Sequence, residues 1–269
     1  MRKYLILSLF LPLLIACGEY QKALNDVKHP MHQYHLAEKY FKQKKYARAA
    51  RLFELSQEAV SRTPQYQRLK YMYAVSLFHL KQYLSAGFQF KAFTQLFPKS
   101  SKTEEAYYYM VRCYYELTPE YYRDLTYGEK MLEKSELFLN RYPNSKYAPE
   151  VKKMAADIIY RFNKKDFEHA KLYYDLGYYK AAIKSFNNFF ADHPGSPLKE
   201  DASYYLFLSE ADLALNSVAA KQAKRAAEAI KTGEKFLKEF PGSRYGKSVK
   251  KYLSKLKKLQ TSEITEKSS

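Results

Sequence analysis

Two cysteines are the strongest nucleophiles in this chain of 269 residues, and only one of them lies where chemistry at sulfur is expected. Cys17 follows a short apolar run that begins after Arg2 and Lys3. A positively charged start, an apolar stretch too short to span a bilayer and a small residue before the cysteine are typical of a cleaved export signal. Cys113 lies in an apolar, tyrosine-rich segment, where a lone thiol is expected to pack in a core. The sequence therefore predicts modification at Cys17 and burial of Cys113.

The tetrapeptide LIAC at 14–17 resembles a bacterial lipobox. In that motif the cysteine thiol receives a diacylglycerol, and cleavage before the cysteine makes it the new N-terminus. One acyl chain binds a membrane marginally, whereas two or more hold a protein there stably. By this resemblance residues 1–16 are a lipoprotein signal peptide and Cys17 is a lipidation site. The alternative is an ordinary secretory signal with a chance cysteine.

The residue after the cysteine indicates which membrane would carry the anchor. Many bacterial lipoproteins that stay at the inner membrane have aspartate there, and this chain has Gly18. By resemblance, glycine favours the outer membrane. No later segment of the sequence is long and apolar enough to be a transmembrane helix. We therefore expect a protein that is lipid-anchored at the periplasmic face of the outer membrane.

The composition is strongly basic and rich in tyrosine. The formal net charge is +18, and removal of Arg2 and Lys3 with the leader lowers it to +16. Such a charge often marks a nucleic-acid partner, but a periplasmic location favours acidic proteins and anionic lipid headgroups instead. The 28 Tyr and 17 Phe, with no Trp and only 8 Gly, indicate a helical protein with much aromatic surface. We expect no nucleic-acid partner.

A four-residue punctuation recurs along the chain, in which proline is followed two residues later by serine. The prolines are spaced 45, 51 and 47 residues apart, which is typical of a solenoid whose repeats end in the same turn. Proline cannot continue the helix before it, and the serine is suited to begin capping the next helix. The four segments are FPKS at 97–100, YPNS at 142–145, HPGS at 193–196 and FPGS at 240–243.

Alanine and aromatic residues recur inside these repeats at a fixed spacing. An alanine is followed nine residues later by tyrosine, three further on by alanine and four further on by phenylalanine. Two antiparallel helices approach closely only where a small side chain meets a large one, so this spacing predicts the crossing of a helix pair. The pattern resembles the tetratricopeptide repeat. Its members are Ala37, Tyr46, Ala49 and Phe53; Ala74, Tyr83, Ala86 and Phe90; and Ala170, Tyr179, Ala182 and Phe186.

The sequence therefore predicts an all-α fold, an α-α superhelix (solenoid) of about five tetratricopeptide-like repeats over residues 31–258. Residues 17–30 are expected to form a lipidated tether that leads into the first repeat. Residues 259–269 are polar enough to predict a disordered tail.

Two departures from the regular repeat are expected within this domain. Thr118-Pro119 should end one helix and open an exposed loop before the next helix begins near Thr126. After Pro143 the pattern predicts one long helix that continues with little interruption almost to Gly177.

Candidate catalytic and metal-binding residues are sparse. His29, His32 and His35 fan across about 120 degrees of a helix, so at most two of them could share an ion. The chain has no Gly-rich phosphate loop, Cys-x-x-Cys, His-Glu-x-x-His or Gly-x-Ser-x-Gly motif. We expect no enzyme activity, no cofactor and no metal site.

A binding groove on the first helices of the repeats is the better candidate. Residues three before, one after and four after the first alanine of each pattern share a helix face. First helices line the concave surface of stacked helix pairs, where aromatic side chains can grip an extended or hairpin peptide. The alternative is that they pack against the neighbouring repeat. The predicted peptide-binding residues are Tyr34, Glu38, Phe41, Tyr71, Val75 and Phe78, and the third such set is Phe167, Lys171 and Tyr174.

The lipobox, the five repeats and a long connecting helix together resemble the BamD family of outer-membrane lipoproteins. The most specific part of the resemblance is 138–196, which contains YPNSKY at 142–147 and YYDLGYYKAAI at 173–183 before HPGS. The resemblance covers nearly the whole chain after the leader. It implies a non-catalytic periplasmic subunit of the β-barrel assembly machinery.

The same resemblance implies partners and a contact site. The protein would stay with the barrel-forming BamA and other assembly-machinery lipoproteins, contact the membrane-proximal POTRA domain of BamA through C-terminal repeats, and receive the terminal β-strand signal of unfolded outer-membrane proteins. An arginine makes the POTRA contact in the family. Ungapped counting back from Pro194 places Ser185 at that position, with Lys184 beside it. These two residues are the predicted partner contacts.

Other interpretations stay open at this point. A tetratricopeptide-repeat lipoprotein that serves cell-wall or secretin assembly has the same architecture. An enzyme is a third possibility, against which the absence of a paired acid, base or nucleophile argues. The closing segment 247–259, KSVKKYLSKLKKL, is basic and amphipathic, and its lysine face is either solvated or a contact to a membrane or partner.

Overall fold

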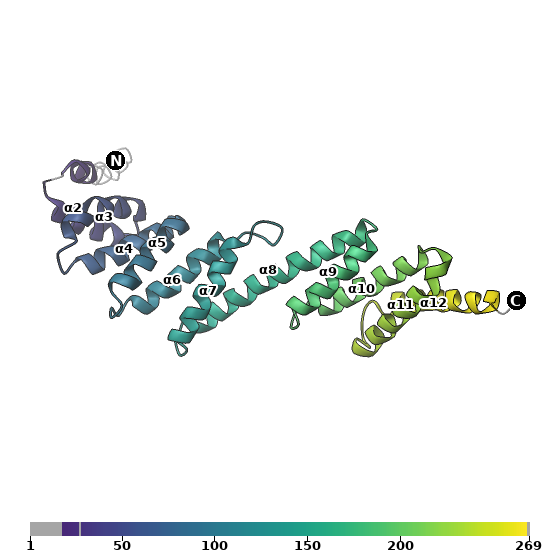
Figure 1. Ribbon diagram of the computed structural model, residues 1–269. Coiled ribbons are helices and arrows are strands. Elements are labelled where there is room, and N and C mark those ends of the chain that lie inside the picture. Colours follow the sequence, from purple (N-terminus) through teal and green to yellow (C-terminus); the bar gives the residue numbers. More distant parts are fainter. Residues whose placement is uncertain (1–17, 27, 268–269) are drawn as a thin grey trace, which may run out of the picture. The chain divides into compact units, whose positions relative to one another are not determined.

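The computed structural model describes residues 18–26 and 28–267, with side chains described as far as Leu259. This part of the chain is helical apart from short turns and contains no β-strand (Figure 1). Cys17 and the predicted signal peptide lie outside the described residues. After a short helix at 18–25, the helices are α2 (Pro30–Lys42), α3 (Tyr46–Val60), α4 (Tyr66–His79), α5 (Tyr83–Leu96), α6 (Thr103–Leu117), α7 (Thr126–Arg141), α8 (Ala148–Asp175), α9 (Tyr179–Asp192), α10 (Lys199–Leu215), α11 (Ala219–Glu239) and α12 (Gly246–Lys267).

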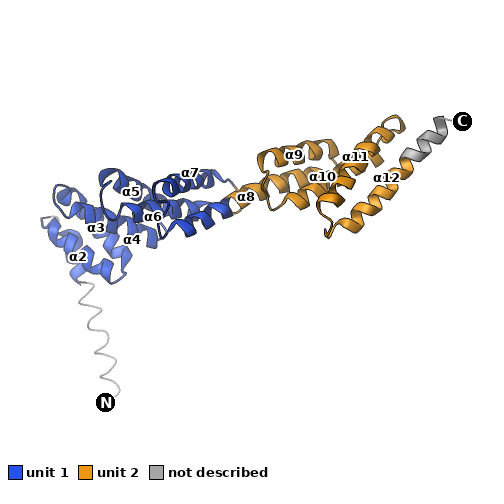
Figure 2. Ribbon diagram, turned by 90° about the horizontal axis from the view of Figure 1, so that it is seen from below, with its two compact units in different colours: residues 1–119, 124–158 blue, residues 120–123, 159–269 orange. Residues whose placement is uncertain are grey.

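The helices fall into two compact units (Figure 2). Unit 1 comprises residues 1–119 and 124–158, and unit 2 comprises 120–123 and 159–269. In unit 1 each helix from α2 to α7 packs on the next, and in unit 2 the same holds from α9 to α12. The predicted all-α fold of tetratricopeptide-like repeats is confirmed, with α12 following the last helix pair.

The predicted helix crossings form the core of the pairs. In each of the three patterns both alanines and the phenylalanine are completely buried. Phe53 lies in the cluster formed by α2, α3 and α4, Phe90 in the next cluster of unit 1, and Phe186 in a cluster of unit 2. The small side chains therefore allow the close approach that the large ones fill.

Tight turns of one type join the helices of three pairs. After α2, α4 and α8 one residue is left-handed: Lys44 (φ 58°), Lys81 (φ 60°) and Gly177 (φ 76°). The N–H of this residue and that of the next both bond back to the last helical turn. In the second pair, Lys81 N donates to Phe78 O at 2.9 Å and the following N–H donates to Leu77 O at 3.0 Å. These two hydrogen bonds satisfy carbonyl groups that the end of a helix leaves without a partner.

The proline turns between repeats share a second hydrogen-bond pattern. The serine hydroxyl accepts a bond of 3.0 to 3.2 Å from the backbone N–H two residues on, and the next helix begins three residues after the serine. The hydroxyl therefore closes the turn before the helix and makes no cap bond to the helix itself, which corrects the predicted capping role. The four serines are Ser100, Ser145, Ser196 and Ser243.

The long helix and the break before α7 also follow the sequence. α8 runs without interruption over 28 residues, and Thr118 adopts an extended conformation that ends α6. Tyr122 in the following loop is 69% exposed, but Leu125 is buried just before α7. Within unit 2, Lys165 Nζ donates to the carbonyl of Arg123 at 3.1 Å. The loop is therefore exposed in part and held to α8 in part.

Residues 18–25 correct the predicted tether over 17–30. Ala23 is completely buried, and its carbonyl accepts a bond from Gln33 Nε2 at 2.9 Å. The ring of Tyr20 meets that of Tyr40 edge-on at 5.7 Å between centroids. From Gly18 onward this segment is therefore part of unit 1, because the small side chain of Ala23 fits against α2.

The C-terminal end also differs from the expectation of a disordered tail over 259–269. α12 continues as a helix to Lys267. No proline or glycine follows Gly246, so nothing in the sequence interrupts the hydrogen-bond ladder of this helix.

One close approach in unit 2 depends on glycine. A Cβ atom at Gly233 on α11 would lie 2.5 Å from Cε2 of Phe207 and 2.9 Å from Cδ2 of Leu253. These distances are too short for any larger residue unless the side chains of Phe207 and Leu253 move. The packing of the last three helices therefore requires glycine at this position.

The left-handed turns give a test of this architecture. A residue with a Cβ is strained in this conformation, so we expect Lys81→Gly to raise the free energy of unfolding by about 0.5–1 kcal/mol. Gly177→Ala should lower it by about 1 kcal/mol, and through the backbone alone, because no atom lies within 4 Å of the added Cβ. Urea unfolding measures both changes. Destabilisation by Lys81→Gly equal to that of the helical control Lys91→Gly would contradict the assignment.

Candidate peptide-binding groove

Unit 1 contains an open groove of about 510 Å³. The helix α4 supplies half of its lining, because Gln67, Arg68, Tyr71 and Met72 recur at the spacing of one helix face. The helices α2 and α5 and the residue before α6 supply the rest. The remaining lining residues are Phe41, Lys42, Phe93 and Lys102.

The floor of the groove is apolar and aromatic. Phe93 is completely buried and Met72 is 5% exposed, so both are fixed by the core. Phe41 and Tyr71 are half-buried and line the groove. Tyr71 packs on Phe93 with 5.6 Å between ring centroids. The floor therefore offers a preformed surface for an apolar or aromatic side chain.

The rim of the groove is cationic. Lys42, Arg68 and Lys102 are all exposed. Arg68 pairs with Glu38 at 2.8 Å, and Lys102 pairs with Glu105 at 2.7 Å. Lys42 makes no ion pair with any residue that the structure describes. The rim can therefore attract a carboxylate, with Lys42 as its uncompensated charge.

Glu38 and Tyr34 hold Arg68 in place. The Tyr34 hydroxyl donates to Glu38 Oε1 at 2.9 Å, and the same carboxylate oxygen receives Arg68. Burial, and next the neighbouring carboxylate of Glu38, raise the pKa of Tyr34 to about 12. The hydroxyl therefore stays protonated and keeps donating at physiological pH.

A second cluster positions Lys102. Its ammonium lies 5.2 Å from the centroid of the Tyr71 ring, and the Tyr71 hydroxyl bonds to Glu105. Burial and this carboxylate both raise the pKa of Tyr71. Burial by itself would raise the pKa of Glu105, but hydrogen bonds from Lys102 and Tyr71 outweigh it and hold that pKa below its usual value.

The structure places the six predicted peptide-binding residues in different environments. Phe41 and Tyr71 line the groove, and Glu38 supports its rim. Tyr34, Val75 and Phe78 are at most 8% exposed and belong to core clusters, which corrects the expectation that they form an accessible surface.

Packing between neighbouring helices accounts for this burial. Tyr34 packs on Phe53 at 6.3 Å, and Phe78 meets Tyr109 at 5.0 Å between ring centroids. Gln67, Arg68 and Met72 were missed, although their spacing from Tyr71 on one helix would have found them. No local signal points to Phe93 or Lys102, because they come from other helices.

A comparison with protein-family models matches two overlapping parts of the chain, residues 26–223 and 167–264, to the YfiO model, described as outer membrane lipoprotein. The chain belongs to this family. The family includes BamD, so the resemblance found in the sequence is confirmed. A search of curated proteins gives no match.

Family membership establishes the location of this YfiO-family protein as the outer membrane, as predicted. None of the helices in the described part of the chain is long and apolar enough to span a bilayer. The predicted lipidation site, Cys17, lies outside the described residues.

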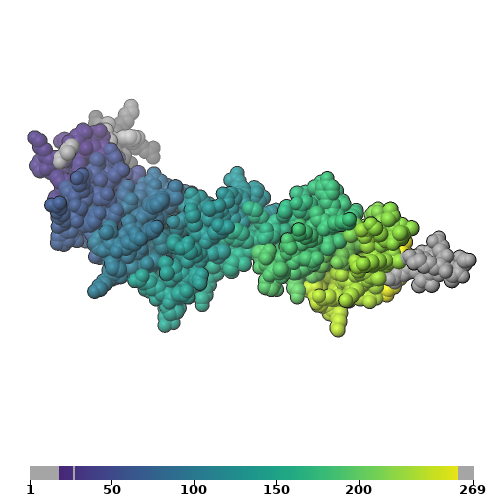
Figure 3. All heavy atoms as spheres, viewed as in Figure 1, coloured from purple at the N-terminus to yellow at the C-terminus, as the bar shows by residue number. Residues whose placement is uncertain are grey.

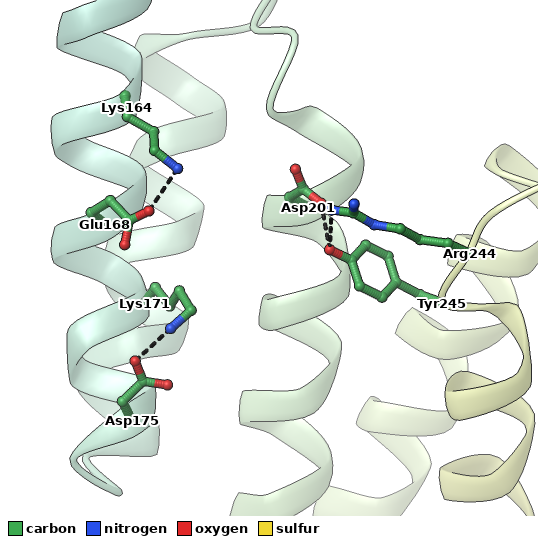
Figure 4. A network of polar contacts seen from close by, with 7 residues as sticks. All are labelled: Lys164, Glu168, Lys171, Asp175, Asp201, Arg244 and Tyr245. Carbon is green, nitrogen blue, oxygen red and sulfur yellow. Dashed lines mark hydrogen bonds and ion pairs between the residues drawn. The ribbon is translucent and has the colours of Figure 1, made fainter.

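The third predicted face, on α8 in unit 2 of this YfiO-family chain, is occupied by contacts within the protein. Phe167 is 4% exposed, and the Tyr174 hydroxyl donates to Asp212 at 2.9 Å. Lys171 pairs with Asp175 one helical turn away at 2.6 Å (Figure 4). For these residues the packing alternative describes the structure.

Unit 2 also shows how successive helix pairs are joined. Arg244 and the Tyr245 hydroxyl both reach Oδ1 of Asp201, at 2.7 and 2.6 Å, which ties the turn before α12 to α10 (Figure 4). The ring of Tyr245 stacks on that of Tyr204 at 3.9 Å between centroids. The joint is therefore held by charge, hydrogen bonding and stacking together.

The predicted partner contacts lie on α9. Lys184 is exposed, and Ser185 is half-buried. Lys184 makes no ion pair within the described part of the chain. A second cavity, of about 410 Å³, lies against the same helix and reaches α10 and α11, where Asn187, Ser203 and Thr232 are among its lining residues.

The remaining residues that could be reactive or bind a metal are buried or make contacts within the protein. Cys113 is completely buried, as predicted, and burial raises the pKa of its thiol to about 12. His29 Nδ1 lies 2.7 Å from Asp26, and His35 lies 3.6 Å from Glu38. Among the described residues no group of three potential metal ligands comes together.

The lowered pKa of Glu105 predicts a pH dependence. A depressed carboxyl pKa contributes stability that is present above the pKa of the unfolded chain and is lost as pH falls through the folded pKa. Because Glu105 is partly exposed, we expect this contribution to be about 0.5 kcal/mol. Glu105→Gln should remove it at neutral pH and flatten the change in stability between neutral and acid pH. Equal pH profiles for the variant and the parent protein in chemical unfolding would contradict this role.

Proposed function

We propose that this protein is a periplasmic scaffold of the β-barrel assembly machinery at the outer membrane. It binds a BamA-like barrel protein through its C-terminal repeats and works beside other assembly-machinery lipoproteins. It receives the C-terminal signals of unfolded outer-membrane proteins in the groove of unit 1 and so promotes their folding and insertion. Acylation of Cys17, after removal of residues 1–16, attaches it to the membrane.

The groove supports the peptide-binding part of this proposal. A terminal signal that ends in an aromatic residue carries a ring and a free carboxylate side by side. The floor made by Phe41, Tyr71 and Phe93 suits the ring, and the cations at Lys42, Arg68 and Lys102 suit the carboxylate. The cavity against α9 also brings Phe190 and Phe236 together with two lysines, but Asn187, Ser203 and Thr232 share its lining, so its wall is more polar than the floor of the groove.

The geometry also fits a transient complex. The groove is open to solvent, and two of its three cations already have carboxylate partners. A bound carboxylate therefore competes with Glu38 and Glu105 for these cations, and its binding free energy is less favourable than it would be with unpaired cations. Modest affinity is what a carrier needs if it must release its client to a barrel protein.

The contact with the barrel protein is assigned to α9. Lys184 is the exposed cation nearest to the position of the family arginine, and its charge has no partner within the described chain. A cation at the rim of an interface contributes mainly to the association rate and to register. Ser185, beside it, can add a hydrogen bond.

Photocrosslinking tests the groove. A photoreactive side chain at Gln67, which is exposed and lines the groove, should capture a peptide that ends in phenylalanine with a free carboxylate. Lys42→Glu should weaken the binding of this peptide about three- to tenfold, since it replaces the uncompensated cation.

The controls separate the groove from general stickiness. The same photoreactive group at Gln95, exposed on α5, should capture little peptide, and Lys91→Glu should leave its binding unchanged. An amidated peptide should bind more weakly than the free acid. Equal capture at both positions would show that the peptide does not bind in the groove. Equal binding of the amide and the acid would show that the terminal carboxylate does not contribute to binding.

Co-purification tests the scaffold. We expect protein solubilised from outer membranes to retain a BamA-like barrel in stoichiometric amount. Lys184→Glu should reduce that recovery severalfold at moderate salt, whereas Lys180→Glu on the same helix should not. Recovery of cell-wall enzymes or a secretin with no such barrel would overturn the proposed role in β-barrel assembly. It would favour a lipoprotein that serves cell-wall or secretin assembly.

A further inference from the structure

The helices α11 and α12 carry most of the net charge of the protein. Residues 219–259 contain 13 basic and 3 acidic residues, a net charge of +10 against +16 for the chain without residues 1–16. In the space-filling view α11 lies uncovered at the surface of unit 2 (Figure 3). The charge is therefore concentrated on a small part of one unit.

The lysines of α12 lie on one side of the helix. Val249, Leu253 and Leu256 are buried against the core of unit 2. At 100 degrees per residue, the positions opposite these three are lysine with two exceptions, which are Ser248 and Ser254. The exposed lysines of this face are Lys247, Lys250, Lys251, Lys255 and Lys258, and Lys257 is exposed at its edge.

The helix α11 repeats the arrangement. Its buried residues include Ala226, Ile230 and Gly233, which face the core. Lys224, Lys231, Lys235 and Lys238 lie on the opposite side, at spacings of seven, four and three residues, and all are exposed. α11 and α12 pack on one another, and the exposed lysines of both helices are called the lysine surface here.

Contacts within the protein leave much of this charge uncompensated. Lys257 pairs with Glu234 at 2.8 Å, and Lys235 approaches Glu239 at 3.8 Å. Lys247, Lys250 and Lys251 have no ion pair or ring contact with any described residue. Like charges held this close repel one another, so the approach of anions lowers the electrostatic free energy of the lysine surface.

The chemistry of the lysine surface favours headgroups over a protein. Specific protein interfaces are centred on buried apolar or aromatic side chains, and residues 219–259 expose no large hydrophobic side chain. Lysine is a flexible point charge, which suits a layer of anionic headgroups that demands no fixed geometry. As an outer membrane lipoprotein, the chain is held within reach of a lipid surface.

We propose that the lysine surface of α11 and α12 binds anionic phospholipid headgroups of the membrane that carries the protein. This contact is electrostatic and lies at the headgroup layer, because the face carries no apolar side chain to insert. It adds a second, salt-sensitive attachment to that of the acyl anchor.

A label within the lysine surface tests the proposal on the full-length acylated protein. Ser254→Cys offers an exposed thiol on this face, whereas Cys113 is buried and unreactive. The protein is reconstituted in phosphatidylcholine vesicles, with or without about 30 mol% phosphatidylglycerol, and a headgroup-bound quencher reports proximity. The anchor attaches the protein in both cases, so any difference reports on α12.

We expect quenching at least threefold stronger in the anionic vesicles, lost at about 1 M salt, where the Debye length is about 3 Å. The variant carrying K247E, K250E and K251E should lose the difference between vesicles. The matched variant with K91E, K99E and K152E, exposed lysines of unit 1, should keep it.

Three results would overturn the proposal. Equal quenching in both vesicles means that the face does not contact anionic lipid. Equal loss in the two triple variants means that net charge, and not the lysine surface, governs the contact. If quenching of the label does not depend on the lipid but the label signal changes when a purified acidic POTRA domain is added, the face binds protein.

Discussion

The contact between an alanine on one helix and a phenylalanine on its partner is the constraint on which this structure depends. Ala37 and Ala49 allow α2 and α3 to approach, and Phe53 fills the space beside them without exposed surface. Loss of such a buried phenylalanine costs about 3–5 kcal/mol in typical cores, which is comparable with the stability of a whole domain. The same contact recurs in three pairs, so it fixes the distance between helices and hence which side chains point outward.

Tyrosine performs the corresponding task between pairs. Tyr108 and Tyr115 on α6 donate to Glu150 and Asp157 on α8, at 2.6 and 3.1 Å. Donors and acceptors are both seven residues apart, about two helical turns, so one register satisfies both bonds. Burial leaves the ring in the core while the hydroxyl keeps a partner, which tryptophan or phenylalanine could not provide in the same way. The abundance of tyrosine in this chain is therefore a property of its repeat joints as well as of its surface.

The surface that remains is used in two ways. In the groove of unit 1, Glu38 and Glu105 hold two cations in fixed positions over an aromatic floor, which suits recognition of one defined group. On α11 and α12, Lys247, Lys250 and Lys251 have no ion pair with any described residue, and residues 219–259 expose no large hydrophobic side chain, which suits a diffuse anionic layer. Both surfaces are made mainly of side chains that are not needed for packing within or between the helix pairs. Function in this fold therefore resides outside the repeated core.

The sequence by itself determined the repeat architecture, because the spacing of Ala, Tyr and Phe and of the proline turns is local and periodic. Family membership was also legible in it, from the lipobox and the segment 138–196. The environment of each aromatic side chain was decided only by the tertiary structure. Tyr34 and Tyr71 stand at equivalent positions of successive repeats, yet one is buried and the other lines a groove, since burial depends on what packs next to each. Phe93 and Lys102 joined the groove from separate helices, and Ala23 brought residues 18–25 into unit 1. Helical periodicity fixes which face of its own helix a residue occupies, whereas the neighbour that covers this face comes from elsewhere in the chain.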